Sequence, residues 1–185
     1  YKHVRRIQRR IFKASCSGDI YTVRFLQKLL LKNPHAKLIA VQTVTTLNRG
    51  KSTAGIDGYR ATTPGDKLKM ARNLCINGKA NIIRRVWIPK PGKTEKRPLG
   101  ISTIHDRAKQ ALAKLALEPE WEAKFEPNSY GFRPGRSAHD AIEAIFTNLH
   151  FDVDKCVFDA DITICFDVID HSALLTKLNT FPLMG

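Results

Sequence analysis

The sequence predicts a mixed α+β fold for a chain of 185 residues. Helical periodicity runs through residues 3–47, two β-rich runs flank a Pro-Gly turn within residues 82–101, and helical periodicity returns from residue 103. The apolar share of 43% is enough for a buried core at this length. No stretch approaches the roughly 20 apolar residues of a membrane span, so we expect no transmembrane helix and no membrane partner.

Three helices are expected at the start of the chain. The helix over residues 3–14 has one apolar face, which is made of Val4, Ile7 and Ile11. The second helix is expected to begin after an N-cap at Asp19 and to end at Asn33-Pro34. The third helix is expected to cover residues 35–47.

The middle of the chain changes from helix to strand. Residues 48–58 are rich in glycine and small polar residues, which predicts a loop. Thr63-Pro64 has the form of an N-cap followed by proline at the first helical position, and we expect that helix to reach about Asn77-Gly78. The β-branched and aromatic run over residues 82–89 predicts a strand, and residues 96–101 are the expected return strand of a hairpin.

Helices are expected again after the hairpin. One covers residues 103–117, and a shorter one lies around residues 121–125. Ser137 and Asp140 have the spacing of a capping box, which predicts the start of a helix that continues through Leu149.

The formal net charge of +14 exceeds what solubility requires, and it is unevenly distributed. Residues 1–100 hold 23 Lys and Arg against four acidic residues, whereas residues 101–185 hold eight against 13. This asymmetry favours a platform that binds a polyanion, next to a site with its own carboxylates. Nucleic acid is the leading candidate, because each neutralised phosphate releases counterions. A solvated basic surface without a partner is the alternative.

The four cysteines are scattered, with no CxxC pair and no histidine at zinc-ligand spacing. The chain begins with a charged periodic segment rather than the apolar region of a signal peptide. Both features predict a reduced intracellular protein, located in the cytoplasm.

Acidic residues interrupt a β-rich run near the end of the sequence. A strand over residues 157–166 would place Asp159, Asp161 and Thr163 on one face, because strand side chains alternate. Carboxylates on such a strand either lie in water at a sheet edge or bind a hard divalent cation. A last helix is expected over residues 172–179.

Two further stretches carry cations in rigid loops. The hairpin over residues 88–100 places four basic residues around its Pro-Gly turn. They could hold a triphosphate, contact a nucleic-acid backbone or contact nothing. The loop over residues 130–137 combines Tyr130 and Phe132 with Arg133 and Arg136, which suits stacking on bases and binding of phosphates.

Several ordered motifs together resemble one known family. They comprise Thr53–Gly58, Ile88–Gly92, Arg97–Ile101, Asp106-Arg107, Gln110, Leu117–Pro119, Phe125, Ser129–Ser137, Ala160–Ile162, Cys165–Asp167 and Ile169–His171. In this order they are similar to the reverse transcriptase domain of group II intron-encoded proteins, in a bacterial, cyanobacterial-like style. The resemblance covers essentially the whole chain.

This resemblance implies a right-hand polymerase architecture of α+β class. Residues 1–50 would form a basic helical amino-terminal extension, residues 51–150 the fingers, and residues 151–185 the start of a truncated palm. The implied activity is RNA-directed DNA polymerisation with two Mg²⁺ ions. Group II intron RNA, an RNA template with a DNA primer, and deoxynucleoside triphosphates are the implied partners.

The resemblance also assigns roles to individual residues. Asp161 matches the first catalytic aspartate and metal ligand, and the Ile162 carbonyl would help to bind one Mg²⁺ ion. Lys90 and Arg97 match residues that hold the incoming triphosphate, and Phe166 matches the residue that selects deoxynucleotides. Arg133 and Arg136 are template or fold contacts in this comparison. The expected RNA-binding residues are Arg5, Arg6, Arg9, Arg10, Arg49, Lys51, Arg133 and Arg136.

The sequence also departs from the family pattern. No Asp-Asp pair occurs in the 185 residues, so the second catalytic motif is absent, and we expect a fragment or a natural truncation that is inactive alone. Ser102 and Thr163-Ile164 differ from the residues that are frequent in the family. Two alternatives remain: a non-catalytic maturase module that binds intron RNA, and a viral RNA-dependent RNA polymerase, against which Phe166 argues.

Overall fold

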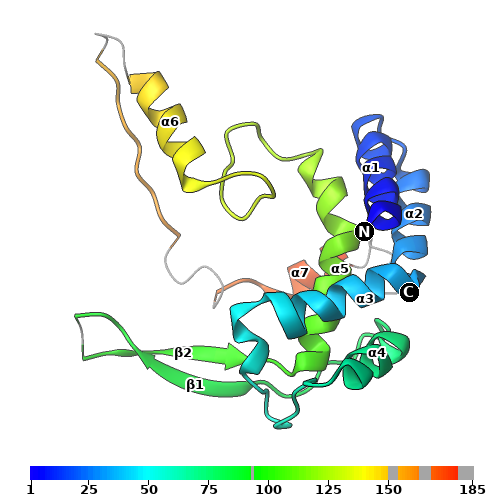
Figure 1. Cartoon of the computed structure of the whole chain (residues 1–185). Helices are drawn as coiled ribbons and strands as arrows, with labels where there is room; N and C mark the ends of the chain where they lie inside the picture. Colours follow the sequence, from blue (N-terminus) through cyan, green and yellow to red (C-terminus); the bar gives the residue numbers. More distant parts are fainter. Residues whose placement is uncertain (93, 150–153, 163–167, 179–185) are drawn as a thin grey trace.

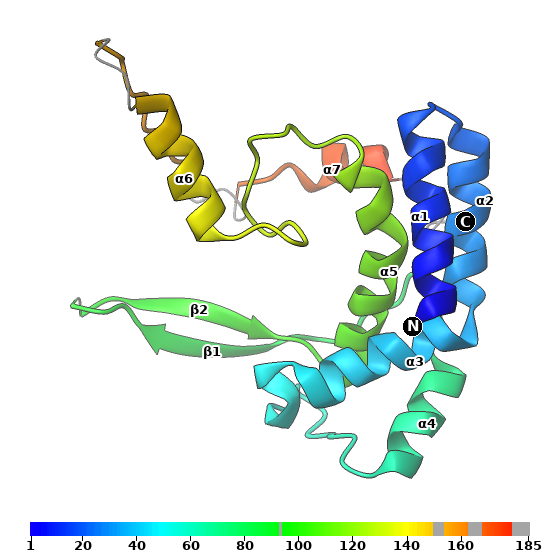
Figure 2. The ribbon, with the colours of Figure 1, turned by 45° about the horizontal axis from the view of Figure 1, so that its top comes forward.

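The computed structural model describes residues 1–92, 94–149, 154–162 and 168–178. Its helical core consists of α1 (Lys2–Cys16), α2 (Ile20–Lys32), α3 (Pro34–Gln42), α4 (Pro64–Asn73) and α5 (Ile104–Glu122). The strands β1 (Arg84–Pro89) and β2 (Lys96–Ile101) form a hairpin, and α6 (Ala138–Leu149) and α7 (His171–Leu178) follow. The hairpin and α6 project from the side of the core opposite α1 and α2 (Figures 1 and 2). The mixed α+β expectation agrees with this arrangement.

Helix α5 lies at the centre of the core, and α1, α2 and α3 pack around it (Figure 2). The apolar face expected for the first helix is confirmed, since Val4, Ile7 and Ile11 are buried. They join an apolar cluster to which α5 contributes Ile104, Ala108, Leu112 and Ala116. The free energy of burying this cluster therefore holds α1 against the rest of the chain.

The expected N-cap of α2 and the expected end of this helix are both confirmed. The Thr22 backbone N–H donates to Asp19 Oδ1 over 3.0 Å, which makes Asp19 the N-cap of α2. Asn33 ends α2 and begins α3, because its side chain accepts from the N–H groups of His35 and Ala36. The third helix is α-helical only to Gln42. It continues as a π-helical turn over Thr43–Leu47 and is followed by a 3₁₀ turn over Arg49–Ser52.

The predicted extent of the fourth helix is wrong at its end. The Thr63 capping box and Pro64 begin α4 as expected, but the helix ends at Asn73 rather than near Gly78. The chain turns to extended backbone at Leu74, which is buried in the core. The Lys109 ammonium on α5 then donates to Asn77 Oδ1 over 3.2 Å and to the Lys79 carbonyl over 2.7 Å. These tertiary contacts hold the segment outside a helix.

The separate short helix expected around residues 121–125 is wrong, because α5 runs on through Pro119 to Glu122. A proline inside a helix leaves the carbonyl four residues earlier without its usual donor. Here that carbonyl belongs to Leu115, and the Gln8 side-chain amide of α1 donates to it over 3.0 Å. The α1–α5 contact thus supplies the hydrogen bond that the proline removes.

The predicted hairpin is confirmed. Strands β1 and β2 are antiparallel, with Arg84 opposite Ile101 and Pro89 opposite Lys96. Gly92 in the connecting turn has a φ of +70°, a conformation that favours glycine. Most of the hairpin is exposed, so its orientation depends on how its base is held.

The capping box of α6 is also confirmed, since the Ser137 backbone N–H donates to Asp140 Oδ2 over 2.6 Å and the Asp140 N–H donates to Ser137 Oγ over 3.4 Å. The strand expected over residues 157–166 is wrong for residues 157–162, which have no regular secondary structure. A strand needs a hydrogen-bonding neighbour, and within the described ranges β1 and β2 pair only with each other. Residues 163–166 lie outside the described residues. The expected final helix is confirmed as α7.

A buried carboxylate joins α2 to the carboxyl end of α5. Glu120 has an exposed fraction of 0%, and its oxygens lie 2.9 Å from Arg24 Nη1, 2.7 Å from Gln27 Nε2 and 2.6 Å from Lys124 Nζ. Burial alone would raise the pKa of Glu120. The hydrogen bonds from Lys124 and Gln27 and the neighbouring positive charges outweigh burial and lower this pKa below its usual value.

Replacement of this carboxylate should destabilise the chain. We expect Glu120→Gln to lower the free energy of unfolding by about 3 kcal/mol, because it leaves Arg24 and Lys124 without their buried counter-charge. Urea unfolding at neutral pH measures the effect. Glu118→Gln is the matched control on the same helix, and its partly exposed pair with Lys114 should contribute less than about 0.5 kcal/mol. Equal effects of the two substitutions would contradict the assignment.

Candidate nucleic-acid interface

Helix α1 presents a continuous cationic face to solvent. The four arginines predicted from the sequence, Arg5, Arg6, Arg9 and Arg10, are exposed and line one groove of about 470 Å³ together with Lys2 and Lys13. None of these six side chains forms a hydrogen bond or ion pair with another residue of the described ranges. The helix therefore brings together six cations that the fold itself does not use.

Arg49 and Lys51 lie elsewhere. They belong to the 3₁₀ turn beyond the end of α3, at the opposite end of α3 from α2 (Figure 2), and they do not line the α1 groove. Lys51 Nζ donates to the Thr46 carbonyl over 3.2 Å, and Arg49 is exposed. These two residues therefore form a small basic patch that is separate from the α1 groove.

The loop over residues 48–58 is fixed to the start of α5 by Arg107. Its guanidinium donates to the Gly50 carbonyl over 2.9 Å and to the Thr53 carbonyl. Desolvation by burial lowers the pKa of Arg107. Gly55 packs so closely that a Cβ atom there would lie 2.6 Å from Thr103 Cα, so only glycine fits. The role of Arg107 could not be read from the sequence.

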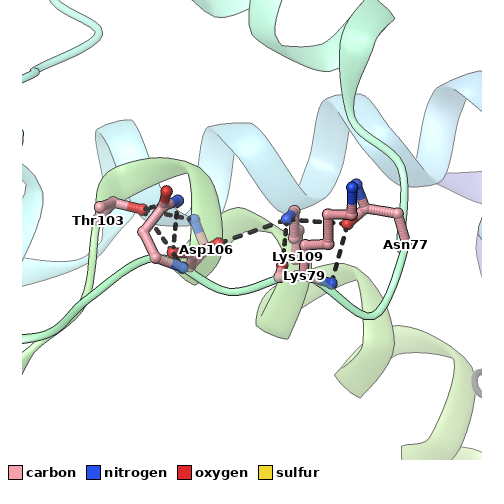
Figure 3. A network of polar contacts seen from close by, with 6 residues as sticks. Asn77, Lys79, Thr103, Asp106 and Lys109 are labelled. Atoms are coloured by element: carbon pink, nitrogen blue, oxygen red, sulfur yellow. Dashed lines mark hydrogen bonds and ion pairs between the residues drawn. The ribbon is translucent and has the colours of Figure 1, made fainter.

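The base of the hairpin is held by Asp106, one residue earlier (Figure 3). Asp106 Oδ2 accepts from Thr103 Oγ1 over 2.8 Å, just after β2, and from the Asn81 N–H over 3.0 Å and the Asn81 amide over 2.9 Å, just before β1. Oδ1 has no hydrogen bond within the described residues and lies 3.5 Å from the Lys109 ammonium. A single carboxylate thus links both strands of the hairpin to α5.

This environment changes the acidity of Asp106. Its exposed fraction is 6%, and burial alone would raise its pKa. The hydrogen bonds from Asn81 and Thr103, with the charge of Lys109, outweigh burial and lower the pKa to about 2. The carboxylate is therefore held in its charged form, which is the form that accepts all these hydrogen bonds.

The two expected triphosphate-binding residues lie near the outer end of the hairpin. Arg97 on β2 is exposed and opposite Ile88, and Lys90 follows the last residue of β1. Lys90 Nζ forms an ion pair of 2.8 Å with Glu95, whose pKa is lowered by that hydrogen bond. The hairpin brings Lys90 and Arg97 to the same end, with the Lys90 charge shared with Glu95.

The structure places Arg133 as a fold contact. Its exposed fraction is 9%, and its guanidinium donates to both Glu122 carboxylate oxygens, over 2.6 and 3.1 Å. The third nitrogen, Nη1, donates to the carbonyls of Glu126 and Ser129, over 2.6 and 2.8 Å. Little of this group remains for RNA. The Glu122 pair could not be predicted from the local sequence.

Arg136 and its aromatic neighbours remain accessible in the same loop. The Arg136 guanidinium lies 5.6 Å from the centre of the Tyr130 ring, which is a cation–π arrangement. Phe132 is fully exposed and has a φ of +60°, uncommon for a residue with a side chain. The expected combination of aromatic and cationic groups is therefore made by Tyr130, Phe132 and Arg136, without Arg133.

Asp161 and Ile162 are exposed in the irregular segment 154–162. A carboxylate and a backbone carbonyl are donors that suit Mg²⁺. Within the described ranges, however, no three His, Cys, Asp or Glu residues come together as a ligand set. Phe166 lies outside the described residues. A magnesium site therefore stays a prediction, with Asp161 as its first candidate carboxylate.

Two family models match most of the chain. Residues 1–74 match the N-terminal domain of reverse transcriptase, and residues 88–184 match the family of reverse transcriptases (RNA-dependent DNA polymerases). The chain is 31% identical to maturase-like protein 1 of Euglena gracilis, over 94% of the chain and 39% of that protein. It is 34% identical to the group II intron-encoded protein LtrA of Lactococcus lactis, over 83% of the chain and 26% of that protein.

These similarities assign the chain to a family. It belongs to the reverse transcriptases, in the group whose members are group II intron-encoded proteins and maturases. The chain spans only a quarter to two fifths of the length of those relatives, at 26% and 39%. In the part of the chain that the structure describes, no helix is long and apolar enough to cross a membrane.

Removal of the Asp106 charge should destabilise the chain in a pH-dependent way. At neutral pH we expect Asp106→Asn to cost about 2 kcal/mol, the free energy that corresponds to lowering the pKa from 3.8 to about 2. A lowered folded-state pKa stabilises above the unfolded value, and this contribution is lost as the pH falls from about 4 to about 2. The difference from the parent should shrink over that window.

Denaturant unfolding at a series of pH values measures this difference. Asp66→Asn is the matched control, because Asp66 forms the same capping interaction at the start of α4 but lies at the surface. A cost that does not change between pH 7 and pH 2.5 would contradict the role of the Asp106 charge.

Proposed function

We propose that the chain forms the fingers and the start of the palm of an RNA-directed DNA polymerase that also binds group II intron RNA. The match of residues 88–184 to the reverse transcriptase family carries this proposal. The amino-terminal match and the similarity to LtrA, a group II intron-encoded protein, support its intron context. The alternative of a non-catalytic maturase module is not favoured by these matches. A viral RNA polymerase fits less well than the intron relatives.

Polymerisation of nucleotides depends on positioning and on neutralisation of charge rather than on covalent chemistry by the protein. In this proposal Lys90 and Arg97 bind the triphosphate, where arginine offers a planar fork and lysine a point charge. Asp161 and the Ile162 carbonyl hold metal, and Phe166 lies against the sugar. Bound Mg²⁺ would polarise the phosphate and neutralise its charge.

The hydrogen bonds of Asp106 at the base of the hairpin support the proposed role of the hairpin in binding the triphosphate. Lys90 and Arg97 lie at the far end of an exposed two-stranded hairpin, and such a hairpin is marginal without support. Because Asp106 links Asn81 and Thr103 at the base, the two cations are carried on an arm fixed to α5. This arrangement suits a site that must meet a triphosphate in a defined position.

The polymerase assignment can be tested by primer extension. The 185-residue chain alone should incorporate no deoxynucleotides with Mg²⁺, because no Asp-Asp pair is present in it. A longer polypeptide that contains this chain together with an Asp-Asp motif should incorporate them, and Asp161→Asn in that polypeptide should lower the rate at least about a thousandfold while RNA affinity stays the same. Robust incorporation by the 185-residue chain, or by the Asp161→Asn protein, would contradict the proposal.

RNA binding by the 185-residue chain should depend strongly on salt. If the α1 groove neutralises about six phosphates, affinity should fall about a thousandfold between 50 and 200 mM salt. Replacement of Arg5, Arg6, Arg9 and Arg10 by glutamine should flatten that slope with little effect on stability, because the four side chains lie off the buried face.

A salt titration with structured intron RNA measures both slopes, and Asp161→Asn serves as the control whose affinity should not change. An unchanged slope in the four-arginine variant would show that the α1 cations are only a solvated surface.

A further inference from the structure

Cations gather at a second place, around a hollow of about 320 Å³ between α3 and α4. Lys32 at the end of α2, Lys37 on α3 and Arg72 on α4 line it. None of these three side chains forms a hydrogen bond or ion pair with another residue in the described ranges. Three elements therefore bring uncompensated positive charge to one hollow.

The same hollow has an apolar part. Pro34, Leu38 and Leu68 line it, and the two leucines, which come from different helices, are each 43% exposed. A purely electrostatic surface would not need these groups. A hollow with three cations beside an apolar surface fits a ligand that carries a phosphate and a flat apolar group together.

A nucleotide with an unpaired base is such a ligand. In a duplex the bases are stacked inside and only phosphate and sugar are presented, whereas an unpaired base can be turned out onto an apolar protein surface. A peptide made only of acidic residues would satisfy the cations but would leave Leu38 and Leu68 in water. The chemistry of the hollow therefore favours RNA with an unpaired nucleotide.

The hollow lies near the amino-terminal end of α1. The rings of His3 on α1 and His35 on α3 lie 5.7 Å apart between their centres. His3 follows Lys2, which lines the α1 groove, and His35 follows Pro34, which lines the hollow. The hollow is therefore close enough to α1 for one RNA strand to contact both.

We propose that the hollow between α3 and α4 is a subsite for one unpaired nucleotide of the RNA whose backbone follows α1. The phosphates on either side of this nucleotide bind Lys32, Lys37 and Arg72. The base of the nucleotide lies against Leu38 and Leu68. This inference rests on the proposed RNA binding and adds that the chain distinguishes unpaired from paired RNA.

Affinity for two probes tests the inference: a labelled single-stranded RNA of about 20 nucleotides and a duplex of the same length. Lys37→Gln/Arg72→Gln should reduce the salt slope for the single strand by about 1.4, at roughly 0.7 for each lost phosphate contact. Lys114→Gln/Lys155→Gln removes the same charge outside the hollow and should leave that slope unchanged.

The apolar part is tested by a matched pair of substitutions. Leu68→Gln should weaken single-strand binding about fivefold, with an unchanged salt slope and unchanged duplex binding, because it removes only the surface for the base. Leu29→Gln, at a leucine that is equally exposed on α2, should have no effect. Both positions are at the surface, and thermal unfolding monitored by circular dichroism verifies that the variants are folded.

Several outcomes would overturn the inference. Equal effects of Leu68→Gln and Leu29→Gln, equal loss of duplex binding, or displacement of the RNA by poly-glutamate at the same charge concentration would each do so. If the four-arginine variant loses affinity while the variants of the hollow match their controls, only this inference fails. If the parent chain does not bind RNA, the proposed function fails as well.

Discussion

The structure depends on α5, a helix that is held at both ends by carboxylates. At its start, Asp106 binds the flanks of the hairpin while the adjacent Arg107 binds the loop over residues 48–58. At its end, Glu120 receives Arg24 and Gln27 from α2. Since α1, α2 and α3 bury their apolar faces on the same helix, α5 connects the basic helices to the arm that carries Lys90 and Arg97.

Features that depend on neighbours in sequence could be predicted. The cap at Asp19, the capping box at Ser137 and the hairpin with its Pro-Gly turn all depend on residues that are close in sequence. The continuity of α5 could not be predicted in this way. It requires Gln8, 107 residues away from Leu115, to replace the hydrogen bond that Pro119 removes. The end of α4 is similar, because Lys109 holds the segment that follows it.

The same distinction applies to the candidate site. The α1 face followed from helical spacing alone, so the sequence was sufficient to bring its four arginines together. Arg133 was also expected to bind RNA, yet its guanidinium is occupied by Glu122. The role of Asp106 in holding the base of the hairpin was not predicted either, although Asp106 was among the matching motif residues. Its partner Asn81 lies 25 residues earlier, and nothing local indicates that contact.

Cations that have partners within the fold differ in role from cations that have none. Arg24, Arg107, Lys109 and Arg133 each have carboxylate or carbonyl partners within the fold. On α1, by comparison, Arg5 and Arg9 lie one turn apart, as do Arg6 and Arg10, and like charges at that spacing destabilise a helix. A polyanion along the groove would reduce this repulsion, and its binding would stabilise the folded chain by a free energy that grows with the logarithm of its concentration divided by its Kd. The charges that destabilise the free helix are therefore the ones that favour binding of a polyanion. This arrangement is expected of an interface rather than of a surface that only needs to be soluble.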